Sequence, residues 1–228
     1  MNDLQPFLSE LSARHAHLCP RQVLGVRVGL AGPALLGLAA PRSDKAFLVI
    51  AETDGCFADG LEVAAGVSVG HRTLRVMDYG KVAATFVNAK TGEAIRLAPR
   101  PDVRQTAYAY APGETRHYYA QLEGYQRMPD SELLSVCRVS LNSPVGQIVG
   151  RAGVRTNCCV CGEEIINQRE IMVGGQAFCR ACLGRGYYAP RQEALAAPQK
   201  LAGKSGRALR QSQTQFPGLV IERGVGLT

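Results

Sequence analysis

The sequence predicts an α+β fold in which a mainly antiparallel sheet is flanked by helices, followed by a small cysteine-containing ribbon and a basic C-terminal tail. Three observations lead to this prediction. Short apolar runs bounded by turn residues fill much of residues 1–150, and segments with helical periodicity flank them. Two Cys-x-x-Cys pairs then fall within residues 151–188. Residues 189–228 are rich in Gly, Ser, Gln and Ala, with scattered basic residues.

Two helices are expected at the start of the chain. Apolar residues recur with the spacing i, i+3, i+4 and i+7 across residues 3–14, which predicts an amphipathic helix. Pro20 suits the first position of a second helix, which we expect to continue over Arg21–Leu30. Three glycines in and after this segment lower its helix propensity, but their spacing offers a smooth face for close packing on a sheet. They are Gly25, Gly29 and Gly32.

Apolar runs of strand length follow. Ala46–Ala51 predicts a strand that ends in a polar turn before a short helix near Phe57–Ala65. Leu74–Met77 and Val82–Val87 are expected to pair as a hairpin around the turn at residues 78–81. The remaining expected elements are a strand at Ala94–Leu97, a helical, tyrosine-bearing region over Asp102–Arg127 and a strand at Leu133–Leu141.

Charge and hydropathy narrow the class of protein. The net charge is +7, and residues 189–228 hold six Lys/Arg against two Asp/Glu with a single aromatic residue, Phe216. This composition favours a solvated tail with one short strand at Leu219–Ile221. The longest apolar stretch, Val23–Ala40, is interrupted by a charge, glycines and a proline, so it is a poor membrane span. No secretion signal is readable, and we therefore expect a cytoplasmic protein with reduced thiols.

The strongest local signal is the four-cysteine motif. Cys158 and Cys161 form one Cys-x-x-Cys pair, and 17 residues separate it from the pair of Cys179 and Cys182. Four thiolates bind Zn²⁺ tetrahedrally in closed structural sites, so we predict a zinc ribbon over residues 151–188. Such a small unit cannot bury enough surface alone, and the metal would supply its folding energy. A redox-active pair, or iron in place of zinc, is the alternative.

The residues around this motif are assigned simpler roles. Ile165–Asn167 and Ile171–Val173 are expected to form a small hairpin that brings the two cysteine pairs together. Cys159 is placed outside the zinc ligands as a spectator thiol. Cys137 lies in an apolar run, and we expect it to be a buried small hydrophobic residue.

A second group of ligand-type residues lies near the start of the chain. His15, His17 and Cys19 alternate with a period of two, so they would point to one side of an extended segment, whereas in a helix only His15 and Cys19 would share a face. Pro20 disfavours helix at Cys19, and a helix beginning at this proline would favour the Cys19 thiolate. Cys56 follows a predicted strand. Imidazole and thiolate together suit zinc, copper and some iron sites, so these four residues are a candidate site for a second transition metal.

Three motifs in this order resemble those of the FmdE-like proteins, the E-subunit family of formylmethanofuran dehydrogenase. His15–Pro20 (His-Ala-His-Leu-Cys-Pro) is similar to the family pattern His-Gly-His-x-Cys-Pro-Gly. Glu52–Cys56 (Glu-Thr-Asp-Gly-Cys) is similar to Glu-Thr-Asp-x-Cys, and Asp78–Lys81 (Asp-Tyr-Gly-Lys) matches a third motif, with Phe86–Asn88 after it. Many members also carry a C-terminal four-cysteine zinc finger. The resemblance covers about residues 5–188.

This resemblance implies an α+β domain over residues 1–150 that forms a homodimer and carries a metal, usually zinc, near the His/Cys motif. His15, His17, Cys19 and Cys56 match the family's metal-binding positions. The matching residues on the third motif are Asp78, Tyr79 and Lys81.

Two positions depart from the family pattern. The glycine after the proline is Arg21 here, and a later family cysteine is replaced by Val67, which cannot bind a metal. His71 lies four residues beyond Val67 and is a candidate substitute.

The leading functional hypothesis is therefore a zinc-binding accessory or metal-handling factor that works with a metalloenzyme partner protein and has no membrane segment. An enzyme is the first alternative, with Cys19 as a nucleophile or a metal-activated water, and Tyr79 and Lys81 as electrostatic helpers. The sequence identifies neither catalytic residues nor a substrate. A nucleic-acid-binding regulator that uses the ribbon and basic tail ranks third.

Overall fold

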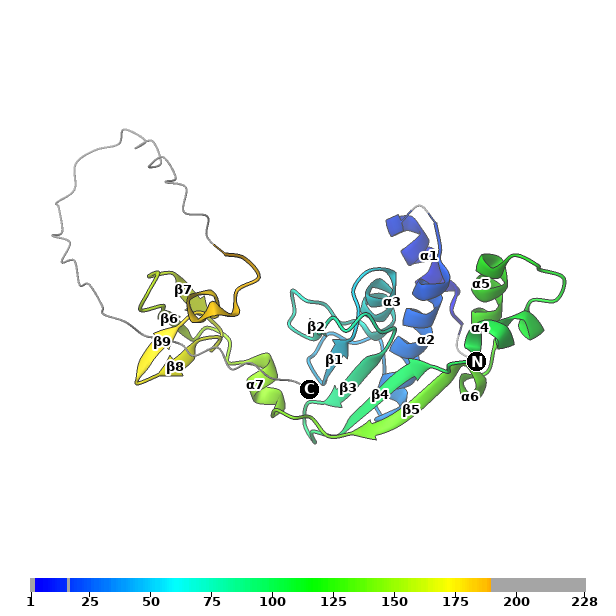
Figure 1. Ribbon diagram of the computed structural model, residues 1–228. Coiled ribbons are helices and arrows are strands. Elements are labelled where there is room, and N and C mark those ends of the chain that lie inside the picture. Colours follow the sequence, from blue (N-terminus) through cyan, green and yellow to red (C-terminus); the bar gives the residue numbers. More distant parts are fainter. Residues whose placement is uncertain (1–2, 16, 190–228) are drawn as a thin grey trace, which may run out of the picture. The chain divides into compact units, whose positions relative to one another are not determined.

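The computed structural model describes residues 3–15 and 17–189 of the chain (Figure 1). No helix in these two ranges is both long and apolar enough to cross a lipid bilayer. The helices before the ribbon are α1 (Gln5–His15), α2 (Pro20–Leu35), α3 (Cys56–Ala65), α4 (Val103–Thr106), the 3-10 turn η1 (Ala107–Tyr110), α5 (His117–Arg127), α6 (Asp130–Leu133) and α7 (Val145–Val149). The ribbon ends in the helical turn η2 (Ala181–Arg185).

A five-stranded sheet with the strand order β2-β1-β3-β4-β5 occupies the centre of the first part of the chain. β1 pairs in parallel with β2, whereas its pairing with β3 and the β3–β4 and β4–β5 pairings are antiparallel. The predicted α+β class with a mainly antiparallel sheet is confirmed. The five strands are β1 (Phe47–Ala51), β2 (Leu74–Val76), β3 (Ala84–Asn88), β4 (Ala94–Pro99) and β5 (Leu134–Val139).

The prediction of a hairpin around residues 78–81 is wrong. β2 and β3 flank β1 on opposite sides, so the segment between them crosses the end of β1 instead of joining two paired strands. The Glu52 carbonyl, just past β1, accepts hydrogen bonds from the backbone N–H groups of Tyr79 (2.9 Å) and Lys81 (3.1 Å). A sequence pattern shows where strands lie, but it does not show which strand each one pairs with.

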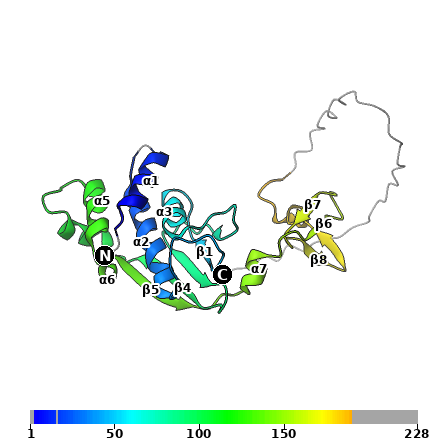
Figure 2. The same cartoon turned by 180° about the vertical axis from the view of Figure 1, so that it is seen from behind.

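Helices α2 and α3 lie over one face of the sheet, as both views show (Figures 1 and 2). The two helices approach each other at glycines. A Cβ atom added at Gly25 of α2 would lie 2.3 Å from the Phe57 carbonyl oxygen and 2.8 Å from the Gly60 Cα atom of α3. One added at Gly60 would lie 2.5 Å from the Gln22 carbonyl oxygen. The two backbones are therefore in direct contact, which a side chain at either position would prevent.

This contact changes the role expected for the α2 glycines. Gly25 and Gly29 face α3, because a Cβ atom at Gly29 would meet the Ala64 side chain at 2.9 Å. Only Gly32 faces the sheet, where a Cβ atom would lie 2.4 Å from the ring of Phe86. The smooth face is used as predicted for close packing, but most of it packs on a helix.

Arg27 connects α2 to the end of α5. Its side chain is buried, and it donates hydrogen bonds to the carbonyl oxygens of Tyr125 and Met128, each at 2.7 Å. It also contacts the Asp130 carboxylate at 2.6 Å. Since a buried guanidinium is stable only when its N–H groups have acceptors, this network fixes the position of α5 against α2.

The opposite face of the sheet carries a smaller apolar cluster. Leu48, Val87 and Ala94 are buried there, and residues of α7 pack against them. Cys137 is exposed on β5, so its predicted burial is wrong. β5 is the last strand of the sheet and pairs on one side only, and an apolar run at such an edge does not guarantee that each of its side chains is covered.

The ribbon contains two hairpins where one was expected. β6 (Arg155–Asn157) pairs with β7 (Glu164–Ile166), and β8 (Ile171–Val173) pairs with β9 (Gln176–Phe178). The predicted pairing of residues 165–167 with 171–173 is therefore wrong, because each of these segments pairs with a neighbour next to a cysteine pair. The tail and its expected strand at residues 219–221 lie outside the described residues. The domain boundaries at 150 and 188 stay predictions.

Replacing Gly25 with alanine tests the α2–α3 contact. The new methyl group would overlap backbone atoms of α3, which cannot rotate away, so we expect the free energy of unfolding to fall by about 1–3 kcal/mol. Urea denaturation followed by circular dichroism measures this change. Gly146→Ala in α7 is the control, because no atom lies within 4 Å of its added Cβ. Equal unfolding midpoints for the two variants would contradict the close contact.

Candidate functional site

The four ribbon cysteines converge on one point. The Sγ atoms of Cys158, Cys161, Cys179 and Cys182 all lie within 4.8 Å of one another. The two Cys-x-x-Cys pairs come from separate hairpins, and they are joined where the Cys159 N–H donates to the Ala177 carbonyl oxygen at 2.9 Å. This group could hold a metal ion, and four sulfur donors are compatible with zinc.

Backbone dipoles already favour ionisation of one of these thiols. Hydrogen bonds from the backbone N–H groups of Cys161 and Cys179 lower the pKa of Cys158 to about 6. The neighbouring sulfur of Cys179 raises the pKa of Cys182 to about 12, and burial adds to this effect. Without a metal, ionisation of one thiol disfavours ionisation of its neighbours. A divalent cation would lower the pKa of all four thiols, because it stabilises every thiolate that binds it.

In the first part of the chain, Cys19 and Cys56 lie together. Cys19 precedes α2 in an extended conformation (φ −121°, ψ 157°), as Pro20 predicts, and Cys56 opens α3 directly after Gly55. Gly55 has a φ of 69°, a conformation that glycine adopts without strain. Burial, and then a hydrogen bond with the Cys19 thiol, raise the pKa of Cys56. The close packing of α2 on α3 thus brings two thiols into contact from segments far apart in the sequence.

The segment that carries Cys19 is held in place by polar contacts. The Gln22 side-chain oxygen accepts a hydrogen bond from the Cys19 N–H at 2.7 Å. From α5, the Tyr118 hydroxyl donates to the Leu18 carbonyl oxygen at 2.8 Å. These two contacts hold both polar atoms of the peptide group between Leu18 and Cys19.

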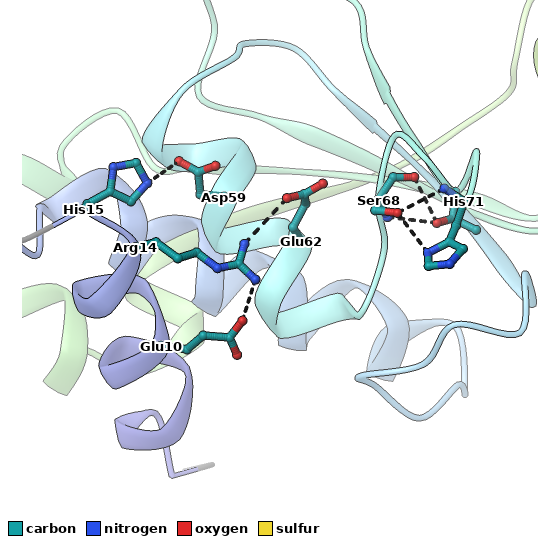
Figure 3. A network of polar contacts seen from close by, with 8 residues as sticks. Glu10, Arg14, His15, Asp59, Glu62, Ser68 and His71 are labelled. Carbon is teal, nitrogen blue, oxygen red and sulfur yellow. Dashed lines mark hydrogen bonds and ion pairs between the residues drawn. The ribbon is translucent and has the colours of Figure 1, made fainter.

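His15 does not lie in an extended segment, because α1 continues through it. The prediction that His15, His17 and Cys19 alternate along one extended strand is therefore wrong. The Nε2 atom of His15 lies 2.9 Å from Oδ2 of Asp59 on α3 (Figure 3). His17 is exposed in a bend between α1 and α2. Within the described residues, only the four ribbon cysteines gather three or more ligand atoms within 4.8 Å.

His71 lies away from the two thiols. It forms a 3.0 Å contact between its Nδ1 atom and the Ser68 hydroxyl, beyond the C-terminal end of α3, whereas His15 faces Asp59 near the start of that helix (Figure 3). Ten residues of α-helix span roughly 15 Å, so His71 does not reach Cys56. Val67 is buried in the core. The structure therefore does not place His71 as a substitute ligand.

The two acidic motifs have structural roles that the sequence did not reveal. Glu52 forms a two-point ion pair with Arg96, whose Nε and Nη2 atoms lie 2.5 and 2.7 Å from the two carboxylate oxygens. The hydrogen bonds from Arg96 lower the pKa of Glu52. The Asp78 carboxylate accepts a hydrogen bond from the Gly80 N–H at 2.9 Å and closes its own turn. Both carboxylates are thus occupied in shaping the loop beside Cys56.

A cavity of about 690 Å³ opens beside the two thiols. Cys19 and Cys56 form part of its wall, together with Gly80 from the third motif and Tyr118 from α5. Burial raises the pKa of Tyr118, and the nearby Cys19 adds to the shift. The volume is in the range of small-molecule sites.

Two residues of this region were missed at the sequence level. Asp59 stands three residues after Cys56 on α3, a spacing that places both on the same face of the helix, so a helical interpretation of the segment could have found it. Tyr118 comes from a segment about a hundred residues distant, and no local pattern points to it.

Comparisons with known proteins agree with the motifs. The family described as "FmdE, Molybdenum formylmethanofuran dehydrogenase operon" matches residues 14–135, which is more than half of the chain. A solved structure of a tungsten formylmethanofuran dehydrogenase FmdE-like protein from Syntrophus aciditrophicus shares the fold with a TM-score of 0.52. The two are 18% identical, and the alignment covers 82% of this chain and 96% of that protein.

A curated protein of Archaeoglobus fulgidus is also similar. It is named a probable S-adenosyl-L-methionine-binding protein and is 35% identical over 86 residues. The match covers 36% of this chain, which spans only 24% of the relative's length.

The pKa of Cys158 predicts how zinc binding depends on pH for a metal-free ribbon that keeps the fold described above. Zinc binds thiolates, and in this fold Cys158 is ionised above about pH 6, so its coordination releases no proton there, whereas an unfolded ribbon would release a proton from Cys158 as well. We expect fewer than four protons to be released per ribbon zinc at pH 7.5, and the number to increase as pH falls through about 6. Calorimetric titration in buffers with different ionisation enthalpies measures this number. Release that does not change with pH would contradict the assignment of an ionised Cys158.

Proposed function

The chain belongs to the FmdE family, and from this membership and the geometry of its thiols we propose that it is a two-centre zinc-binding protein. In this proposal one zinc stabilises the ribbon, and a second, exchangeable metal binds in the first domain. The protein acts as an accessory or metal-handling factor for a metalloenzyme of the formylmethanofuran dehydrogenase type. The convergence of four sulfur atoms within 4.8 Å is the observation that carries the metal-binding part.

The ribbon zinc is a closed site in this proposal. Four cysteine ligands fill a tetrahedral shell and leave no position for water or substrate. The ribbon's strands are only three residues long, and Cys158 and Ile165 are its buried apolar residues among those described. So small a core cannot stabilise a fold, and the metal is the main source of folding free energy.

The second metal is assigned to Cys19 and Cys56, with His15 or His17 as a further ligand. The contact between His15 and Asp59 supports this assignment. Histidine ligands usually donate their other ring N–H to a carboxylate, which fixes the tautomer and the ring orientation. With the Nε2 proton directed to Asp59, Nδ1 of His15 is left with a lone pair for a metal.

An enzymatic role is the second candidate, favoured by the cavity beside the thiols. The raised pKa of Cys56 disfavours a free thiolate nucleophile at that residue and fits a metal ligand better. An enzyme built on this site would use the open position of the metal to activate water or to polarise a substrate.

Metal analysis of the purified full-length protein tests the proposal. We expect about two zinc ions per chain, and about one in each of the double variants Cys158→Ser/Cys161→Ser and Cys19→Ser/Cys56→Ser. A chelator should remove the first-domain metal quickly, because that metal would lie beside an open cavity, and the ribbon metal slowly, because four cysteine ligands would fill its shell.

Cys137→Ser and Cys159→Ser are matched controls, since both thiols are exposed and neither belongs to the proposed ligand sets. Each should retain two metals. A wild-type protein that holds a single zinc, lost on mutation of Cys158 and Cys161, would limit metal binding to the ribbon and refute the metal-handling role.

The His15–Asp59 pair gives a separate test of the first-domain metal. Asp59→Asn removes the charge that orients the imidazole but preserves the shape of the side chain, so we expect the zinc affinity of that centre to fall about 10–100-fold. Competition with a chromogenic chelator measures the affinity. The ribbon centre, measured in the same titration, should not change. A first-domain affinity equal to that of the wild type would exclude His15 as a ligand oriented by Asp59.

A further inference from the structure

The charged side chains that line the cavity beside Cys19 and Cys56 are all positive. Arg21 from the first turn of α2 and Arg100 and Arg104 from the segment before and within α4 line it, and no carboxylate among the described residues does so. A concave surface with cations and low-dielectric walls concentrates an anion in its interior. The positive charge of the cavity therefore favours an anionic ligand.

Two of these arginines have no acidic partner in the described part of the chain. Arg100 lies 3.6 Å from Asp102, but Arg21 and Arg104 form no ion pair there. Most other arginines of the same domain are paired with a carboxylate, and Arg72 and Arg75 donate to backbone carbonyl oxygens instead. The paired ones are Arg14, Arg27, Arg42, Arg96, Arg116, Arg127 and Arg138.

The remaining wall is largely apolar. Leu24, Val82 and Val103 line it, and the rings of Tyr118 and Tyr125 add aromatic surface. A bare inorganic ion would leave this surface in contact with water, whereas an organic molecule would cover it. The lining thus fits a ligand with an apolar body and an anionic group.

A buried hydrogen-bond donor lies near the Cys19 end. Gln22 is fully buried, and its Nε2 atom has no acceptor. Its Oε1 atom is held by the Cys19 N–H at 2.7 Å, and since both atoms of the amide are bonded to one carbon, Nε2 also lies close to Cys19. Gln22 does not itself line the cavity, so its unmet donor is best satisfied by a negatively charged sulfur of Cys19.

We propose that this cavity binds a small organic anion whose carboxylate or phosphate group is held by Arg21 and Arg104, with Arg100 at their side. Its apolar body lies along Leu24 and Val103 and brings the molecule beside the Cys19 and Cys56 sulfur atoms. Arginine suits this role, because its planar fork of N–H donors matches the oxygens of carboxylates and phosphates. The binding goes beyond the proposed metal function and does not require a metal.

Isothermal titration of the full-length protein with matched six-carbon probes tests this proposal. Hexanoate and hexyl phosphate carry the two anionic groups, and hexan-1-ol is their neutral counterpart. We expect both anions to bind more tightly than the alcohol, with an affinity that falls as NaCl is raised. The tighter of the two anions identifies the preferred group.

Arg21→Gln and Arg104→Gln should each weaken anion binding by about tenfold, the effect of losing one hydrogen-bonded charge, and leave hexan-1-ol binding unchanged. Arg127→Gln is the matched control, because it removes one exposed arginine of the same domain that does not line the cavity. Equal affinities for the anions and the alcohol would overturn the proposal. So would an equal loss of anion affinity in all three variants.

Each titration is repeated on zinc-free and zinc-loaded protein. Anion binding by a protein that takes up no zinc in its first domain when zinc is offered would leave this inference standing while the metal-handling function fails. Two bound zinc ions without a preference for anions would give the reverse result.

Discussion

The direct contact between the backbones of α2 and α3 is the constraint on which the first domain depends. Gly25 and Gly60 allow it, and no other residue could occupy either position without moving a helix. Cys19 directly precedes α2 and Cys56 opens α3, so the distance between these two helices also sets the distance between the thiols. The same contact between helices therefore determines both the packing of the core and the geometry of the candidate site.

Polar contacts of high sequence separation complete this arrangement. Arg27 attaches the end of α5 to α2, and this helix then presents Tyr118 to the Leu18 carbonyl beside the first thiol. Glu52 holds the loop of the third motif through its backbone carbonyl and pairs with Arg96 through its side chain. The motif residues thus fall into two groups. Glu52 and Asp78 shape the backbone beside the site, whereas Cys19 and Cys56 line its cavity.

The sequence predicts this structure well where the signal is local. The spacing of Cys158, Cys161, Cys179 and Cys182 determines that they can meet, and Pro20 determines the extended conformation of the residue before it. It fails where the outcome depends on distant partners. No local pattern shows that β2 pairs with β1 in parallel and β3 antiparallel on its other side, and the exposure of Cys137 follows from the place of β5 in the strand order. For the same reason Tyr118 and the cavity could not have been foreseen.

The two groups of cysteines differ in a way that assigns them different kinds of chemistry. The ribbon offers four sulfur atoms, an arrangement that would saturate a metal and serve folding. The first domain offers two sulfur atoms, a histidine oriented by a carboxylate and a cationic hollow beside them. A metal there would keep a position that an anion held by Arg21 and Arg104 could approach. If the proposed first-domain metal is present, exchange of metal or ligand is therefore expected there, whereas four cysteine ligands would leave a ribbon metal no open position for a substrate.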